Sequence, residues 1–233
     1  TVTVNATDKP QKDPISIVLK QQDADMKKDK VSQGDASLEG AEFTVKFYAG
    51  AEATGTPTDT WVVKTDKDGY AGLDKQWLVS GNVDKYLDNG QLYLPLGTVT
   101  VQETKAPKGY LLNNQLFTSR ITSEGTNEYV RTFNIPITPE TVVTGKFDIY
   151  KIISKNDSSS ISKPEQGAEF TAVLKRYVTK YGSVEEAIKH KDEFSKKEWS
   201  ILTTGAYGRA QSGELAYGTY VVKQTGGQAE VER

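Results

Sequence analysis

Short runs of alternating apolar and polar positions recur along the chain and predict β-strands. These runs are rich in β-branched and aromatic residues, and they occur at 43–48, 60–65, 97–102, 129–135 and 219–223. Turn sequences such as Asp66-Lys-Asp-Gly69 and Asp88-Asn-Gly90 separate them. The pattern predicts an all-β chain folded as antiparallel sandwiches of short strands.

One block of sequence occurs twice. The first copy opens with Leu38-Glu-Gly-Ala-Glu-Phe-Thr and closes with Gly97-Thr-Val-Thr-Val-Gln-Glu-Thr, and the second opens with Gln166-Gly-Ala-Glu-Phe-Thr and closes with Gly218-Thr-Tyr-Val-Val-Lys-Gln-Thr. An alternating run that ends in a lysine, Lys20 or Lys151, precedes each copy. We therefore expect an extra N-terminal strand over 1–12 and two tandem domains over 13–140 and 141–233.

One segment departs from the strand pattern. Ser183-Val-Glu-Glu186 has the form of a capping box, and apolar residues continue among charged ones up to Trp199. The sequence predicts a helix over 183–199, inserted between strands of the second domain, with His190 exposed to solvent. Pro136 and Pro139 predict a short, stiff junction between the domains.

Composition argues against several classes of function. The 233 residues carry a net charge of −2, contain no cysteine and contain one histidine. Nucleic-acid binding, disulfides, catalytic triads and histidine or cysteine metal sites therefore lack their usual residues. No apolar run approaches the ~20 residues that span a bilayer, and the acidic turn at Asp66 is expected to be a hairpin and not a calcium site. We expect no cofactor, no metal, no nucleic-acid partner and no membrane contact by this segment, and we find no residue pair suited to a hydrolase.

The end of the first repeat carries a more specific motif. The run Val101-Gln-Glu103-Thr-Lys-Ala-Pro107-Lys-Gly109-Tyr110 resembles the E-box of Cna B-type domains, which occur in Gram-positive SpaA-type pilins and cell-wall adhesins. The Gly-Ala-Glu-Phe opening and the Leu-Gly-Thr approach to the box strengthen the resemblance. It implies immunoglobulin-like, prealbumin-like sandwiches, an extracellular location at the cell wall or cell surface, and a role in adhesion or in a pilus.

The resemblance also implies self-formed isopeptide chemistry. Lys20 would be the nucleophile, Glu103 the proton shuttle and Asn134, on the last expected strand, the acceptor; Asn113, Asn114 and Asn127 are alternatives in expected loops. Physical chemistry agrees with these roles, because burial favours a neutral amine and a protonated carboxyl group. The amine could then attack the carboxamide while the acid relays protons and ammonia leaves. Such a chain crosslinks itself once and has no external substrate.

The second domain departs from this pattern. Lys151 holds the expected nucleophile position, but Gln224 stands where the acid belongs, and no last strand is recognisable before Arg233. Its sandwich should present an unpaired edge. At the other end of the chain Asn5 precedes Lys20 by 15 residues, much as Asn134 precedes Lys151 by 17. Either the chain belongs to a longer tandem array, or the N-terminal strand of one copy completes the second domain of another, with Asn5 as partner of Lys151.

Two functions follow from these expectations. The first is a structural stalk of a pilus or surface adhesin, stabilised by the isopeptide bond and partnered by neighbouring modules or subunits of the same fibre. The alternative is a ligand-binding adhesin domain that recognises a host matrix protein or glycan. Its signs would be exposed aromatic side chains, and the candidates are Trp61, Trp77, Tyr181 and Trp199. No sortase signal of the Leu-Pro-x-Thr-Gly form is present.

Overall fold

The computed structural model describes residues 9–153 and 163–227. Its contacts divide the chain into two units, one of Thr1–Val31 and Ser37–Thr141 and one of Ser32–Ala36 and Val142–Arg233. Strands are the main regular structure of both units, which confirms the all-β prediction. Most of the N-terminal strand expected over 1–12 lies in residues 1–8, outside the described residues. Asn5 lies there as well.

The described residues of the first unit form eleven strands and one 3-10 turn. They are β1 (Lys12–Pro14), β2 (Ile17–Asp23), β3 (Glu42–Tyr48), β4 (Asp59–Lys64), β5 (Tyr70–Gly72), β6 (Leu78–Ser80), η1 (Asp84–Tyr86), β7 (Leu87–Asp88), β8 (Gln91–Pro95), β9 (Gly97–Lys105), β10 (Leu116–Ile121) and β11 (Ile137–Glu140). One sheet has the order β10-β9-β3-β4-β6, a second has the order β11-β2-β5, and β1, β8 and β7 form a third.

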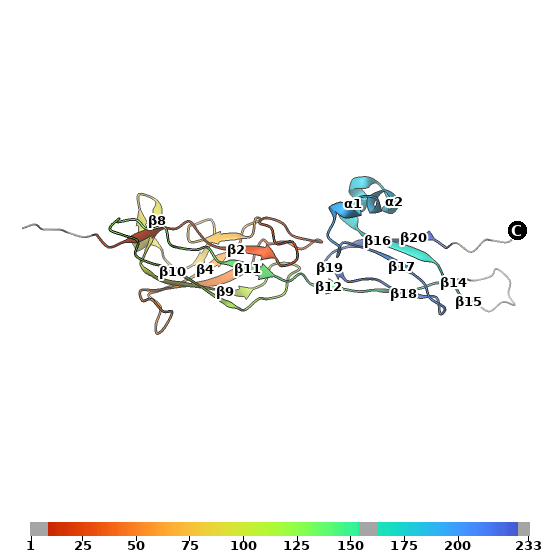
Figure 1. The fold of residues 1–233 in the computed structure, drawn as a ribbon, viewed down its shortest axis with the longest axis horizontal. Helices are drawn as coiled ribbons and strands as arrows, with labels where there is room; N and C mark the ends of the chain where they lie inside the picture. Colours follow the sequence, from red (N-terminus) through yellow and green to blue (C-terminus); the bar gives the residue numbers. More distant parts are fainter. Residues whose placement is uncertain (1–8, 154–162, 228–233) are drawn as a thin grey trace, which may run out of the picture. The chain divides into compact units, whose positions relative to one another are not determined.

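The first and last long strands of this unit are neighbours. β11 lies beside β2 in a parallel pairing, with Ile137 opposite Lys20 and Glu140 opposite Asp23 (Figure 1). On its other side β2 pairs with β5 in the antiparallel sense. β2 therefore lies between β11 and β5 in this sheet.

Apolar side chains from the sheets form the core of the first unit. Phe43, Val45 and Phe47 alternate along β3 with half-buried polar residues, as the period of a strand with one buried face requires. Trp61 from β4 and Leu19 from β2 are also fully buried. Because β2 alternates in the same way, Gln21 and Asp23 follow Leu19 onto the buried face.

In the second unit, the part of the chain that the structure describes forms nine short strands and several helical segments. They are β12 (Thr144–Gly145), β13 (Asp148–Tyr150), β14 (Ile152–Ile153), β15 (Lys163–Pro164), β16 (Glu169–Leu174), α1 (Lys175–Tyr181), α2 (Val184–Ile188), the 3-10 turn η2 (Lys191–Glu193), β17 (Trp199–Thr203), β18 (Arg209–Gln211), β19 (Leu215–Ala216) and β20 (Tyr220–Gly226). β16 is the centre of a three-stranded sheet with the order β17-β16-β20, and β13 pairs with β18. Among the described residues, no strand pairs with the second edge of β13 or of β20.

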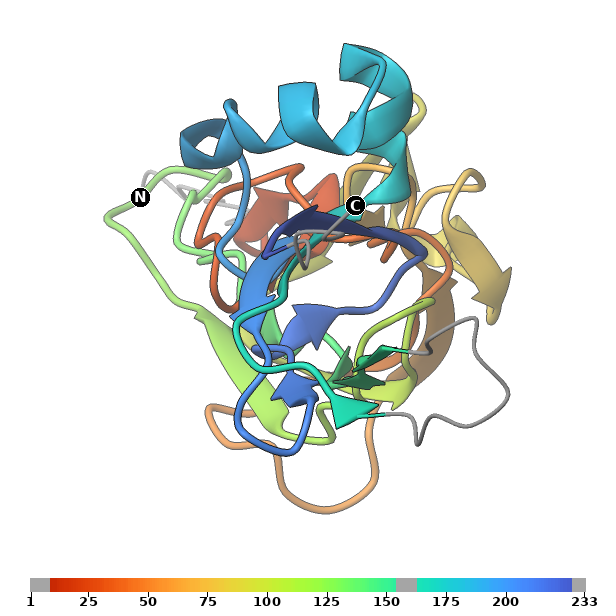
Figure 2. The same cartoon turned by 90° about the vertical axis from the view of Figure 1, so that its right-hand side faces the viewer.

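The single helix predicted over 183–199 is wrong in its extent. Ser183 does cap a helix, since its hydroxyl accepts the N–H of Glu186, but α2 ends at Ile188 and Trp199 begins a strand. A second helix, α1, precedes it and ends at Gly182, whose φ of 93° suits glycine. Figure 2 shows both helices on one side of the strands of this unit. Val184 and Ala187 of α2 pack against Val173 of β16.

His190 is not simply a solvated side chain. Its ring stacks on the ring of Tyr181 with the centroids 3.9 Å apart, and its Nδ1 lies 3.2 Å from Oε1 of Glu193. The predicted solvation is therefore only partly correct, because the side chain is 40% exposed while its ring stacks on Tyr181.

Candidate functional site

A buried polar cluster lies between β2, β9 and β11 in the first unit. Glu103 of β9 is 2% exposed and Gln21 of β2 is fully buried. Nε2 of Gln21 donates a hydrogen bond of 3.1 Å to Oε1 of Glu103. Burial raises the pKa of Glu103 to about 7, against the opposing effect of its hydrogen bonds to Asn113 and Gln21. This carboxyl group can therefore donate or accept a proton near neutral pH.

Glu140 of β11 brings a second carboxyl group into the same core. It is fully buried, and its pKa rises to about 8 because of burial and the nearby charge of Glu103. Gln21 and Thr138 are its polar neighbours, and both act in the opposite direction on this pKa. Ionising both of these buried carboxyl groups at once is costly, because each charge disfavours the other.

Several polar atoms of this cluster have no hydrogen-bond partner. Among the described residues they are Oε1 of Gln21, Oγ1 of Thr138 and both carboxyl oxygens of Glu140. Thr138 lies opposite Gln21 in the parallel pairing of β11 with β2, and it is 1% exposed. The neighbours of Glu140 thus approach it without completing a hydrogen bond.

Asn113 closes one end of the cluster. Its main-chain N–H donates a hydrogen bond of 2.7 Å to Oε2 of Glu103. Its side-chain Nδ2 donates to the carbonyl oxygen of Pro139 at 2.9 Å. The loop after β9 therefore fixes the acid of the E-box-like motif and also holds β11 in place. Asn113, an alternative acceptor in the sequence analysis, has this positioning role in the structure.

Lys20, the expected nucleophile, points away from Glu103. The alternation along β2 places Lys20 on the opposite face from Gln21, where its Nζ lies 3.2 Å from Oδ2 of Asp29. The same Nζ lies 5.1 Å from the ring centroid of Tyr70. The side chain that reaches Glu103 is that of the next residue, Gln21.

Asn134, the expected acceptor, lies outside this cluster as well. It is exposed, and its main-chain N–H and carbonyl both bond to Oγ of Ser119 on β10. The structure therefore does not bring together Lys20, Glu103 and Asn134. The residues that it does bring together are Gln21, Glu103, Thr138 and Glu140, which the sequence analysis did not select apart from Glu103.

Comparison of the two repeats shows why the sequence pointed to the neighbouring residue. The N–H of Gln21 donates to the carbonyl of Gly69 at 2.8 Å, and the N–H of Lys151 donates to the carbonyl of Gly208 at 2.7 Å. The turn glycines thus align Lys151 with Gln21, one residue beyond Lys20. This one-residue offset was readable in the sequence from the glycines of the two turns.

The acid positions of the two repeats are also equivalent. Phe43 pairs with Glu103 in the first unit, and Phe170 pairs with Gln224 in the second. The first unit therefore has glutamine and glutamate at the two inner positions, and the second has lysine and glutamine. In neither unit does a lysine face a glutamate at these positions. The predicted pairing of Lys151 with Asn5 involves a residue outside the described ones and stays a prediction.

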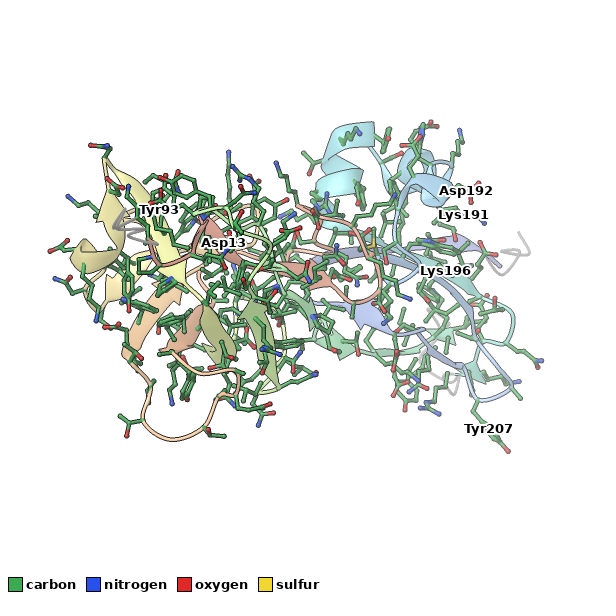
Figure 3. The ribbon with its side chains drawn as sticks, turned by 60° about the vertical axis from the view of Figure 1, so that its left-hand side comes forward. Asp13, Tyr93, Lys191, Asp192, Lys196 and Tyr207 are labelled. Carbon is green, nitrogen blue, oxygen red and sulfur yellow. The ribbon has the colours of Figure 1, made fainter. Side chains whose placement is uncertain are left out.

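The aromatic side chains named as signs of a ligand site are mostly inside the units. Trp61 and Trp77 are buried, and Tyr181 and Trp199 are half-buried. The most exposed aromatic residue described is Tyr207, 88% exposed, which projects from the turn before β18 (Figure 3). The carboxylate of Asp66 is occupied by its own turn, since it accepts the N–H groups of Asp68 and Tyr70 and the indole N–H of Trp77. In the part of the chain that the structure describes, no group of three or more histidine, aspartate or glutamate residues is arranged to hold a metal ion.

Comparison with known proteins gives one match to a family model. Residues 24–134 match the SpaA prealbumin-like fold domain. Curated protein sequences give no match. No described helix is long and apolar enough to cross a membrane.

Several solved structures resemble the chain. The Bacillus anthracis TIE protein is 24% identical over 92% of this chain and 28% of its own length, with a TM-score of 0.46. A streptococcal ancillary pilin is 16% identical over 97% of this chain and 61% of its own, with a TM-score of 0.30. GBS52, the minor pilin of Streptococcus agalactiae, is 13% identical over 87% and 77%, with a TM-score of 0.25. The chain thus spans less than two thirds of the first two proteins.

Proposed function

We propose that the chain is a structural shaft segment of a pilus or adhesin on a Gram-positive cell surface, a proposal supported by the match of residues 24–134 to the SpaA prealbumin-like fold domain. Its partners would be neighbouring modules or subunits of the same fibre. It would act outside the cell, at the cell wall, and would have no external substrate. The pairing of β2 with β11 carries this proposal.

The direction of these two strands decides how the first unit responds to tension. A pull on the start of β2 and the end of β11 acts along a parallel pair in opposite directions. It therefore loads the hydrogen bonds between the strands together, as a shear, and does not open them one after another. Two of these bonds join the N–H of Lys20 to the carbonyl of Pro136 and the N–H of Ala24 to that of Glu140. Such an arrangement suits a module that transmits force between its ends.

The lysine–asparagine crosslink is a separate part of the expectation. The Nζ of Lys20 is engaged by Asp29 and Asn134 lies over β10, so the shaft function that we propose does not depend on that bond in the first unit. The adhesin alternative gains no support from Trp61 or Trp77, since both are buried.

Single-molecule pulling tests the proposal. Because the chain has no cysteine, handles can be attached to introduced pairs. Ser16→Cys with Thr141→Cys pulls the strands in shear, and Lys28→Cys with Thr141→Cys peels them from one end. We expect a markedly higher rupture force for the first pair. Rupture at equally low forces in both geometries would contradict a shaft function.

A further inference from the structure

The buried cluster of the first unit is rich in oxygen atoms and poor in hydrogen-bond donors. Oε1 of Gln21, Oγ1 of Thr138 and both carboxyl oxygens of Glu140 have no hydrogen-bond partner among the described residues. Each of these side chains belongs to a residue that is no more than 1% exposed. Buried polar atoms are almost always paired, so several unpaired oxygens in one place point to a bound ion or water.

These oxygens surround one carboxyl group. The side chains of Gln21 and Thr138 both lie close enough to the carboxyl group of Glu140 to lower its pKa, and the charge of Glu103 raises it. Gln21 donates from Nε2 to Oε1 of Glu103 at 3.1 Å, which leaves its own Oε1 for another partner. The cluster therefore offers an amide oxygen, a hydroxyl oxygen and the oxygens of two carboxyl groups.

We propose that this cluster binds a calcium ion through the side chains of Gln21, Glu103, Thr138 and Glu140. Calcium is a hard cation that takes about 6–8 oxygen ligands in flexible geometry, whereas magnesium keeps several of its waters and suits a closed core less well. One divalent ion also balances the charge of two carboxylates, which are costly to bury unpaired. The sequence predicts no metal, because neutral ligands such as Gln21 and Thr138 give no metal-binding signature.

The loop after β9 gives the ion a way into the cluster. Asn113 covers one end, where its main chain bonds to Glu103 and its side chain to the carbonyl of Pro139. Its neighbours Leu111 and Leu112 are each 53% exposed. Breaking the two hydrogen bonds of Asn113 would uncover Glu103 and leave the pairing of β2 with β11 intact. Once bound, the ion would hold β2, β9 and β11 together.

Thermal unfolding of the full chain, first stripped of metal with a chelator, tests the site. We expect the melting temperature to rise with millimolar calcium and to fall back when the chelator is restored. The same concentration of magnesium should give a smaller rise. Isothermal titration should count one calcium ion per chain. Both measurements are made without load, so they succeed or fail independently of the shaft function and of its pulling experiment.

Three variants locate the ion. Glu140→Gln removes one charge and should abolish the calcium-dependent rise, whatever its melting temperature without calcium. Thr138→Val keeps both carboxyl groups, removes one ligand and should reduce the rise. Asp68→Asn, in the acidic turn after β4, is the control and should keep it. No rise in the wild type, an equal rise with magnesium, a full rise in Glu140→Gln or Thr138→Val, or a rise lost in Asp68→Asn would each overturn the calcium site.

Discussion

Glu140 lies close enough to Glu103 for the charge of one carboxylate to raise the pKa of the other. Both groups belong to strands that contact β2. Glu140 lies on β11, which pairs with β2, and Glu103 of β9 accepts a hydrogen bond from Gln21 of β2. The protonation of this pair is therefore tied to the contact between the first and last strands of the unit.

The stability of the first unit should fall as the pH rises above neutrality. In the folded unit the pKa values are about 7 for Glu103 and about 8 for Glu140, against an ordinary value of 4.5. The folded state thus holds protons that the unfolded state releases, so the stabilisation is complete below pH 4.5 and is lost as the pH passes through 7 and 8. Calorimetry between pH 5 and pH 9 measures this.

The matched variants for this experiment are Glu103→Gln and Glu140→Gln. Each removes one titrating group with little change in shape, and each should flatten the decline in melting temperature above pH 7. A wild-type melting temperature that rises from pH 5 to pH 9 would show that these carboxyl groups are ionised in the folded unit.

Gln21→Lys should give the first unit the amine that its inner site lacks. The new lysine would face Glu103 and Glu140, and burial would favour its neutral form. Condensation with the protonated carboxyl group of Glu140 would form an amide and release water. We expect a chain lighter by one water and resistant to hydroxylamine. The matched control is Gln22→Lys, one residue along β2 on the half-buried outer face, which should lose no water; loss of one water in both variants would place the reaction elsewhere.

Gly97→Ala should destabilise the first unit. A Cβ atom at this position would lie 2.2 Å from the carbonyl oxygen of Tyr48 and 2.7 Å from the ring of Phe47, which is part of the core. Forcing a methyl group into such a packed place costs about 1–3 kcal/mol. Urea denaturation followed by tryptophan fluorescence measures the change.

Gly50→Ala is the control for this steric effect. Its nearest neighbours would be 3.7 Å from the new Cβ atom, so we expect a change within about 0.5 kcal/mol. Equal losses in the two variants would mean that the close approach of β9 to the end of β3 is not what requires glycine at position 97.

Ser183→Ala should weaken the helical segment of the second unit. The hydroxyl of Ser183 accepts the N–H of Glu186 at 3.0 Å, and loss of such a cap costs about 1 kcal/mol. The far-ultraviolet helical signal should melt earlier while the strands of the first unit are unaffected. The exposed Ser80→Ala should change neither, and an unchanged helical transition in Ser183→Ala would show that packing of Val184 and Ala187 alone holds α2.

The fold class and the importance of Glu103 could be read from the sequence, whereas the partners of Glu103 could not. Strand alternation and the repeated motif depend on local chemistry, and they identified the strands and the acid. The cluster depends on which of two neighbouring residues, Lys20 or Gln21, faces inward, and a shift of one residue exchanges the two faces of a strand. The lysine at the end of an apolar run drew the prediction to Lys20, whereas the structure places Gln21 on the buried face.

The helical insertion was predicted only in part, because only one of its two helices has a start signal in the sequence. Ser183 is an explicit start signal, but α1 begins after Leu174 without a side-chain cap. Its sequence contains Tyr177, Val178 and Thr179, residue types that favour strands. The rings of Tyr177 and Phe194 stack with their centroids 3.7 Å apart. This packing stabilises a helix that the helix propensities of its residues do not predict.

The outer edge of β11 is poorly suited to receive another strand. The carbonyls of Pro136 and Glu140 point toward β2, so the alternation turns the main chain of Ile137 and Pro139 outward. Pro139 has no N–H to donate, and its carbonyl is already bonded to Asn113. A further strand would find few main-chain groups to pair with here, so this edge disfavours edge-to-edge aggregation.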